Sequence, residues 1–180
     1  MGEFYFVDGH VEVWTNQGNI FLVSREDVDL VANQLWYKTK NGYMVRTVKA
    51  GGCKKKMIYL HKVIAERVYG NIPPAYQVDH IDGDKLDNRR QNLRLATVSE
   101  NGFNRGANKN NTSGYKGVTW HKVAEKWSSK IEINFVTKNL GLFDDPIVAA
   151  QVYDVAAKMY HGKFARLNFS NPLDKRLDDC

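Results

Sequence analysis

The sequence predicts an α+β fold built from two small blocks, and three features carry this prediction. Short apolar runs bounded by Gly, Asn and Asp recur through residues 1–58 and again through 114–143, as is typical of antiparallel strands. Residues 59–69 and 146–160 have apolar side chains at helical spacing. Residues 105–113 are rich in Asn and Gly and lack apolar periodicity, which predicts a linker between the blocks.

Composition indicates folded cores rather than disorder, since 43% of the 180 residues are hydrophobic and 12% are aromatic. The formal net charge of +6 is compatible with a nucleic-acid binder. No apolar run reaches the length of a bilayer span, so we expect a soluble, intracellular protein without a membrane partner. Cys53 and Cys180 are isolated, which excludes a Cys-x-x-Cys zinc site and a disulfide framework.

Residues 1–58 form a strand-rich N-terminal segment. Ser24 before an acidic stretch predicts a short capped helix, and Asn41-Gly42 between two strands predicts a hairpin. Three consecutive lysines, Lys54–Lys56, fit either a phosphate contact or a solvated turn. The expected strands are residues 4–7, 11–14, 20–23, 36–40 and 43–47.

The next element, residues 59–69, is expected to be a helix. Leu60, Ile64 and Val68 share one face, and Gly70 ends the helix. His61 has no ligand pattern beside it. A lone histidine of this kind is usually packed and hydrogen-bonded, so we interpret His61 as structural.

Residues 77–101 contain the motif around which the chain is organised. Residues 77–81 and 92–97 are expected to be two strands joined by a polar loop. Thr97 and Glu100 have capping-box spacing, so a helix should follow at once and place Asn101 near Asp79 and His80. A carboxylate, a carboxamide oxygen and an imidazole at one point suit a hard cation and a general base.

This motif resembles the HNH (His-Me finger, ββα-metal) nucleases, and more narrowly the phage-type homing endonucleases with Asn at the third HNH position. The resemblance covers residues 59–104. An EF-hand loop is excluded, because Gly83 at position six would put Val78 at position one and His80 at position three. A plain acidic turn remains as an alternative, but it explains neither end of the motif. The matching residues are Asp79-His80, Asp82-Gly83, Asn88, Asn92-Leu93-Arg94 and Glu100-Asn101.

The resemblance implies a mechanism. Asp79 and Asn101 would bind one divalent cation, Mg²⁺ or Mn²⁺, at a scissile phosphate, and His80 would take a proton from the attacking water. Asn92 is assigned to hold the loop through hydrogen bonds that orient His80. Asn88 either assists or satisfies the loop backbone, and Asn104 is a second candidate for the metal shell.

The second block, residues 114–169, is expected to be three antiparallel strands at 117–120, 126–133 and 138–143, followed by a helix that Asp145-Pro146 begins. It resembles an AP2 domain. The residues that carry the resemblance are Ser113–Val118, Trp127, Leu140–Phe143, Ala149-Ala150, Tyr153-Asp154, Ala156-Ala157 and Leu167-Asn168-Phe169.

AP2 domains contact the DNA major groove with the exposed face of the sheet. The resemblance therefore implies a DNA-binding set, to which we add Arg105 from a linker that is either a groove-lying arm or a tether. Thr119, Lys130 and Asn139 depart from the plant pattern, which leaves any inherited sequence preference open. The set is Lys116, Thr119, His121, Lys126, Lys130, Lys138 and Arg105.

The function that these resemblances imply is a metal-dependent, site-specific DNA endonuclease of the homing type. Its partner would be double-stranded DNA, with no small-molecule substrate, and it would act as a monomer or weak dimer in the cytoplasm of a phage-infected bacterial cell. A catalytically inactive DNA-binding regulator and a packaging protein without sequence preference remain alternatives. Residues 170–180 mix charges and are expected to be a loose tail.

Overall fold

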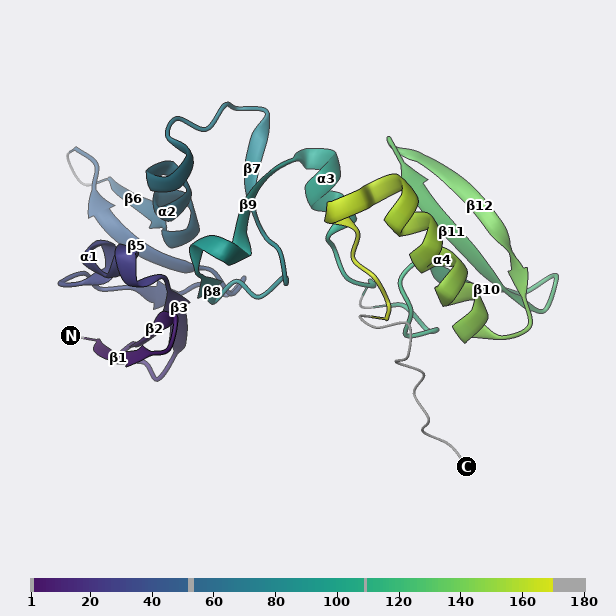
Figure 1. Ribbon diagram of the computed structural model, residues 1–180, viewed down its shortest axis with the longest axis horizontal. Helices are drawn as coiled ribbons and strands as arrows, with labels where there is room; N and C mark the ends of the chain where they lie inside the picture. Colours follow the sequence, from purple (N-terminus) through teal and green to yellow (C-terminus); the bar gives the residue numbers. More distant parts are fainter. Residues whose placement is uncertain (1, 52–53, 109, 170–180) are drawn as a thin grey trace. The chain divides into compact units, whose positions relative to one another are not determined.

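The computed structural model describes residues 2–51, 54–108 and 110–169, which divide into two compact units, Met1–Val98 and Ser99–Cys180 (Figure 1). Helices and mostly antiparallel strands occur in both units, which confirms the α+β class. Cys53, Cys180 and the expected tail at 170–180 lie outside the described residues. Within the described ranges, no helix has both the length and the apolar composition needed to cross a bilayer.

Among its described residues, the first unit contains three sheets. β1, β2 and β3 form an antiparallel meander, and β3 then pairs in parallel with the short β8. β4, β5 and β6 form a second sheet, and β7 pairs with β9. The elements are β1 (Glu3–Val7), β2 (His10–Trp14), β3 (Ile20–Val23), η1 (Arg25–Asp27), α1 (Val28–Val31), β4 (Tyr37–Lys38), β5 (Met44–Lys49), β6 (Lys55–Tyr59), α2 (Leu60–Tyr69), β7 (Tyr76–His80), β8 (Asp87–Asn88), η2 (Arg90–Asn92) and β9 (Leu93–Thr97).

One hydrophobic core joins the N-terminal segment to the motif. α2 contributes Leu60 and Ile64, and β9 contributes Leu93. The remaining buried members come from residues 11–44, so the strand-rich segment and the motif bury their apolar surface against each other. These members are Val11, Val13, Phe21, Val23, Val31, Trp36 and Met44.

Ser24 does not cap a helix, and this expectation was wrong. Residues 25–31 form a 3₁₀ turn and a four-residue helix without a side-chain cap. The Ser24 hydroxyl instead accepts a hydrogen bond from the main-chain N–H of Arg90, at 2.9 Å. The fully buried Asp27 carboxylate accepts hydrogen bonds from Nε and Nη2 of Arg90, each at 2.7 Å. A local cap is thus replaced by long-range contacts that tie residues 24–27 to the motif.

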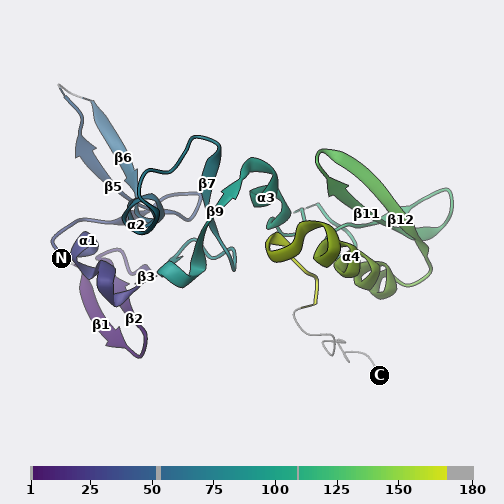
Figure 2. The same ribbon diagram turned by 45° about the horizontal axis from the view of Figure 1, so that its top comes forward.

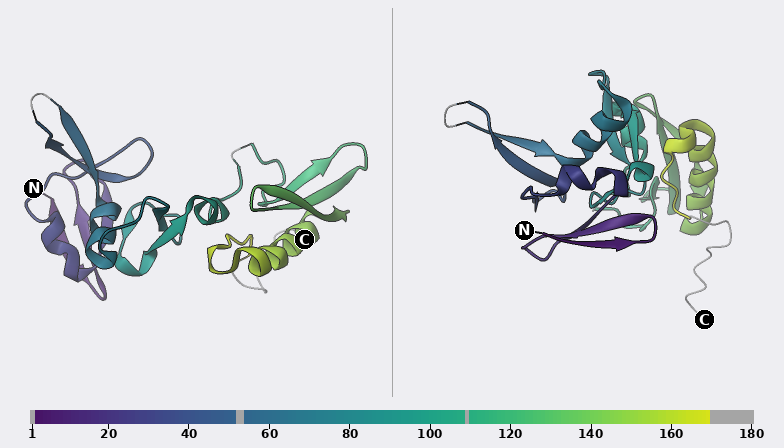
Figure 3. Two further views of the ribbon diagram at one scale, coloured as in Figure 1. Left: turned by 90° about the horizontal axis from the view of Figure 1, so that it is seen from above. Right: turned by 60° about the vertical axis from the view of Figure 1, so that its left-hand side comes forward.

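The second unit is a three-stranded sheet with one long helix along one face, as the view from above shows (Figure 3). α4 follows Asp145, whose carboxylate accepts a hydrogen bond from the main-chain N–H of Ile147 at 2.7 Å, as the Asp-Pro pair predicts. α3 begins at the end of the first unit. The elements are α3 (Val98–Phe103), β10 (Val118–His121), β11 (Lys126–Ile133), β12 (Val136–Phe143), α4 (Pro146–His161) and η3 (Gly162–Phe164).

Small residues let α4 lie close to the sheet. Ala149 and Ala150 pack on Val118, and Tyr153 packs on Ile131. Gly117 has a φ of +78°, and a Cβ there would lie 2.0 Å from the Tyr153 ring. A side chain at position 117 is therefore incompatible with the observed packing of the helix.

The buried carboxylate of Asp154, in the middle of α4, holds the end of the described chain. It accepts hydrogen bonds of 2.8–3.0 Å from the main-chain N–H groups of Asn168 and Phe169. The Asn168 amide in turn accepts the N–H of Lys116 at 2.7 Å and donates to its carbonyl at 3.1 Å. Three segments distant in the sequence are joined by this arrangement.

Candidate active site

β7 and β9 bring together the charged residues of the motif. Asp79 lies opposite Arg94 in the antiparallel register, and both Asp79 and His80 are buried. Nε of Arg94 donates to Oδ2 of Asp79 at 2.8 Å, and its Nη2 approaches the same oxygen at 2.7 Å. The carboxylate is therefore held by an ion pair from the neighbouring strand, which fixes its orientation.

The His80 imidazole is held by Asn88. Oδ1 of Asn88 lies 3.4 Å from Nε2 of His80, a long hydrogen bond. Nδ2 of Asn88 donates to the carbonyls of Lys85 and Leu86, which fixes the direction in which the amide oxygen points. Burial lowers the pKa of His80, whereas the contact with Asn88 and the nearby carboxylates of the loop raise it in part. The net effect favours the neutral ring.

The loop between the strands is braced by Asn92. Its Oδ1 accepts the N–H of Asp82 at 3.1 Å, and its Nδ2 donates to Oδ1 of Asp82 at 2.9 Å and to the carbonyl of Asp87 at 2.8 Å. Gly83 has a φ of +82°, and its N–H donates to the carbonyl of His80 at 3.0 Å. Asn92 thus shapes the loop that follows His80, while Asn88 is the amide that approaches the ring itself.

Aromatic side chains surround the two histidines. The ring centroid of His61 lies 5.2 Å from that of His80, and Tyr43 and Tyr59 lie 5.0 and 5.6 Å from His61. His61 is packed as predicted, but its buried Nδ1 has no hydrogen-bond partner. Burial, followed by the charges of His80, Lys62 and Lys85, lowers the pKa of His61 to about 3. The two tyrosines were not predicted, because no local pattern marks strand ends that meet the motif.

The oxygen donors predicted to bind a metal divide between the two units. Asp79 belongs to the first unit, whereas Asn101 in α3 and the buried Asn104 belong to the second. No group of three or more His, Cys, Asp or Glu able to hold a metal occurs among residues 2–51, 54–108 and 110–169. A carboxylate and carboxamides are nevertheless hard oxygen donors that suit Mg²⁺ or Mn²⁺ once phosphate or water completes the ligand set. The roles of Asn101 and Asn104 as metal ligands stay predictions.

The predicted DNA-binding residues separate into two groups in the second unit. Val118 packs on α4, so the alternating Thr119 and His121 point to the opposite side of the sheet. His121 lies opposite Lys126 in the register. Lys130, opposite Asn139, is exposed on the same side as Thr119. Together they form an exposed polar face.

Lys116 and Lys138 do not lie on this face, contrary to expectation. Lys116 precedes β10, and its Nζ donates to the carbonyl of Phe103. Burial lowers its pKa to about 8. Lys138 lies opposite Ile131, on the helix side, and its Nζ donates to the hydroxyl of Tyr160 at 2.9 Å. Both ammonium groups are engaged within the unit.

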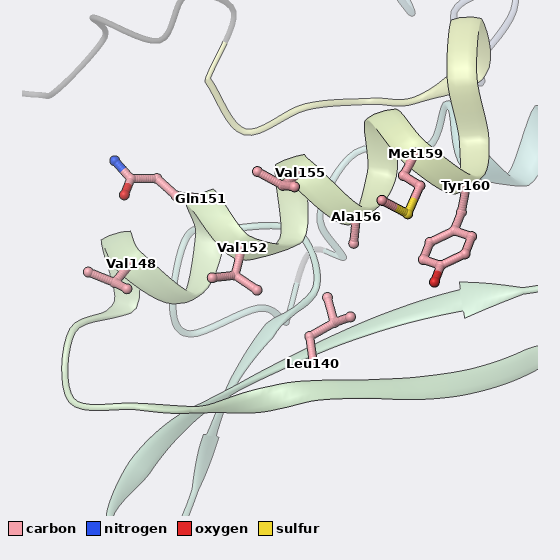
Figure 4. A pocket seen from close by; sticks show the side chains of 8 residues that line it. All are labelled: Leu140, Val148, Gln151, Val152, Val155, Ala156, Met159 and Tyr160. Carbon is pink, nitrogen blue, oxygen red and sulfur yellow. The ribbon is translucent and has the colours of Figure 1, made fainter.

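Grooves lie beside the sheet in the described part of the second unit. Arg105 lines a groove of mixed polar and apolar character with Thr119 and Lys130, which places the basic residue of the predicted linker beside the exposed face. An apolar groove runs between α4 and β12, and its side chains offer no acid–base pair or set of metal ligands (Figure 4). The residues of the apolar groove are Leu140, Val148, Gln151, Val152, Val155, Ala156, Met159 and Tyr160.

Comparison with known proteins decides the family. A family model described as HNH endonuclease matches residues 58–103, which include the β7–β9 pair and α3. The "Uncharacterized HNH endonuclease L560" of Acanthamoeba polyphaga mimivirus is 32% identical over 171 residues, covering 92% of this chain and 85% of the relative. The chain belongs to the HNH endonuclease family.

Other proteins also resemble this chain. Protein 3.8 of Escherichia phage T7 is 39% identical over 106 residues, covering 59% of this chain and 87% of that protein. A solved structure on DNA binding and cleavage by the HNH homing endonuclease I-HmuI is 24% identical, with a TM-score of 0.35. The likeness covers 56% of this chain and 55% of that one.

Proposed function

We propose that this member of the HNH endonuclease family is a metal-dependent, site-specific DNA endonuclease of the homing type, which hydrolyses a phosphodiester with His80 as general base. The observation that carries the proposal is a buried imidazole, held by Asn88 beside the Asp79 carboxylate, within the segment that matches the family. A base must be neutral to accept a proton, and burial keeps the pKa of His80 below its ordinary value.

The contact with Asn88 favours one tautomer of His80. Because the Asn88 oxygen faces Nε2, the favoured tautomer carries its proton on Nε2 and accepts at Nδ1. Nδ1 would then take the proton of the attacking water. Positive charge that develops on the ring would be stabilised by the Asn88 oxygen and by the loop carboxylates, with the loop held in shape by Asn92.

Asp79 and Asn101 would hold the divalent cation, and Asn104 is a further candidate. When bound, Mg²⁺ or Mn²⁺ supplies stabilisation of the charge that develops on the phosphate and on the leaving 3′ oxygen. Arg94 supports this role of Asp79 by holding Oδ2 and so fixing the plane of the carboxylate.

Recognition of the DNA site is assigned to the second unit, as an AP2-like domain. The exposed face opposite α4 supplies Thr119, His121, Lys126 and Lys130, and Arg105 lies in the adjoining groove. Such a face suits contacts to base edges and phosphates. Lys116 and Lys138 are engaged elsewhere and are the weakest members of the proposed set.

One observation favours a second function, an inactive DNA-binding regulator. The Asp79 carboxylate is already neutralised by Arg94, as expected if the carboxylate had only a structural role. A cleavage assay separates the two functions.

The test is cleavage of a random-fragment DNA library in Mg²⁺, Mn²⁺ or EDTA. The variants are His80→Ala and a matched control, His10→Ala in β2, whose Nδ1 lies 3.3 Å from the carbonyl of Asp8. We expect metal-dependent ends clustered at one sequence for the wild type and the control, and none for His80→Ala. Binding without cleavage in any metal would instead support the regulator.

A further inference from the structure

The short helix α3 carries the candidate metal ligand Asn101, yet it has little to keep it folded by itself. It has six residues, none of them buried, and one of the six is Gly102. Isolated helices of this length are marginal in water, and glycine lowers helix stability further. The conformation of α3, and with it the direction of the Asn101 amide, therefore depends on contacts with other elements.

The last residue of α3, Phe103, is held by side chains of the second unit. The ring of Phe103 stacks on that of His161, with centroids 3.7 Å apart and ring planes 6° from parallel. The main-chain carbonyl of Phe103 accepts a hydrogen bond from Nζ of Lys116. This carbonyl lies at the helix C-terminus, where it has no partner within the helix and where a positive charge is favourable. α3 accordingly lies beside the C-terminal end of α4 (Figure 2).

Both groups that hold Phe103 are themselves fixed within the second unit. His161, at the end of α4, is buried, and its Nε2 donates to the carbonyl of Glu132 in β11 at 2.8 Å. The main chain of Lys116 forms two hydrogen bonds with the side-chain amide of Asn168, at 2.7 and 3.1 Å. Because these anchors belong to α4, to the sheet and to the end of the described chain, α3 should move with the second unit.

We propose that Lys116 and His161 are positioning residues that fix α3 to the second unit and so hold the Asn101 amide in its orientation as a metal ligand. The proposal deepens the proposed function and rests on it. The unit assigned to recognition of the DNA site would then also supply a ligand for the cation, so cleavage would require both units on the same DNA. Lys116 acts here through α3 and does not contact a phosphate.

The test compares Lys116→Met with Lys158→Met in the full chain. Lys116→Met keeps the side-chain stem and removes the ammonium group, and Lys158 is an exposed lysine of α4. Hydrogen exchange at the α3 amides and binding to a mixed-sequence duplex are measured in EDTA. Cleavage of the random-fragment library is measured over a range of Mn²⁺ concentrations. For Lys116→Met we expect faster exchange in α3, unchanged DNA affinity and an Mn²⁺ concentration for half-maximal cleavage that is about tenfold higher, whereas Lys158→Met should match the wild type.

Two further variants separate positioning from a general loss of folding, which thermal melting monitors. Phe103→Ala removes the ring stack from the side of α3, leaves Lys116 and His161 in place, and should have the same effects as Lys116→Met. Lys116→Arg keeps a cationic donor and should restore slow exchange in α3 and the wild-type Mn²⁺ dependence. If Lys116→Met lowers the melting temperature, Phe103→Ala decides the test.

The possible failures of the two proposals are distinguishable. An unchanged Mn²⁺ dependence in Lys116→Met and Phe103→Ala would overturn the positioning role while leaving the nuclease intact. Weaker DNA binding by Lys116→Met, with a salt slope reduced by about 0.9, would also overturn it, because that result is expected of a lysine on a phosphate. Faster exchange in α3 without cleavage by the wild type would support the attachment of α3 to the second unit and overturn the nuclease.

Discussion

The imidazole rings of His61 and His80 meet edge to face, with centroids 5.2 Å apart. Two histidines at this distance would repel each other if both were charged. The low pKa of His61, about 3, keeps that ring neutral throughout the physiological range, so it adds no positive charge beside His80. His61 therefore acts as a packed aromatic wall for the candidate base.

Replacement of His61 tests this role. His61→Phe keeps a ring and removes the buried, unpartnered Nδ1, so we expect stability equal to or above that of the wild type and retained cleavage. His61→Ala opens a cavity and should lower the free energy of unfolding by about 3 kcal/mol. Urea unfolding and cleavage rates measure both effects. Complete loss of cleavage in a stable His61→Phe protein would show that His61 has a chemical role.

Protonation of His61 in the unfolded chain should lower the stability of the protein in acid. The folded-state pKa of His61, about 3, lies below the unfolded value near 6.5. Between these values the unfolded chain binds more protons, so the stability present above pH 6.5 is lost as the pH falls, by up to about 1.4 kcal/mol per pH unit. The free energy of unfolding, measured with urea at pH values from 7 to 4, should fall less steeply with decreasing pH for His61→Phe than for the wild type.

Cleavage should stay fast at pH values at which a histidine of ordinary pKa would already be protonated and inactive as a base. The base acts when neutral, and the pKa of His80 is lowered, mainly by burial. The rate should therefore fall only below the ordinary value of about 6.5. Single-turnover rates in Mg²⁺ locate the midpoint. Asn88→Ala removes a contact that raises the pKa and should move the midpoint further down; an upward shift would contradict the assigned tautomer.

Asp27 should be a major source of stability in the first unit. Its fully buried carboxylate joins Arg90, and Asp27→Ala leaves that guanidinium without its main partner. We expect a loss of about 3 kcal/mol in urea unfolding. Asp29→Ala is the control, because Asp29 is exposed and pairs with Arg67 at the surface, where ion pairs contribute little. An equal loss of unfolding free energy in the two variants would contradict the importance of burial for the Asp27 ion pair.

Alanine substitutions at Gly117 and Gly114 distinguish the cost of backbone strain from the cost of a steric clash. Both have a left-handed φ, +78° and +76°, but only a Cβ at position 117 would meet another group, the ring of Tyr153. Gly114→Ala should cost about 1 kcal/mol, and Gly117→Ala about 3 kcal/mol or more. Thermal melting of the two variants makes the comparison. Similar melting temperatures would show that α4 can shift to make room.

Local signals made much of this fold predictable. The apolar run at Ile20–Val23 is β3, and the spacing of Leu60 and Ile64 marks α2. The motif indicated β7 and β9 because its polar residues have fixed spacing. Family membership follows from the same residues.

Features that depend on long-range pairing were not predictable. The parallel contact of β3 with β8 joins Val23 to Asn88 and leaves no local pattern. The side on which Lys138 emerges depends on the register shift between Ser129 and Lys130, so position in the sequence alone gave the wrong face. The same holds for Tyr43, which reaches His80 only through the folded hairpin.

The contact of Asp154 with Asn168 and Phe169 decides how far the second unit must extend when it is produced by itself. A chain cut after Gly162 would keep every strand and all of α4, yet it would leave a buried carboxylate without these donors. The smallest transferable version of this unit therefore extends to Phe169. A fusion that joins this unit to another protein should place its junction beyond that residue.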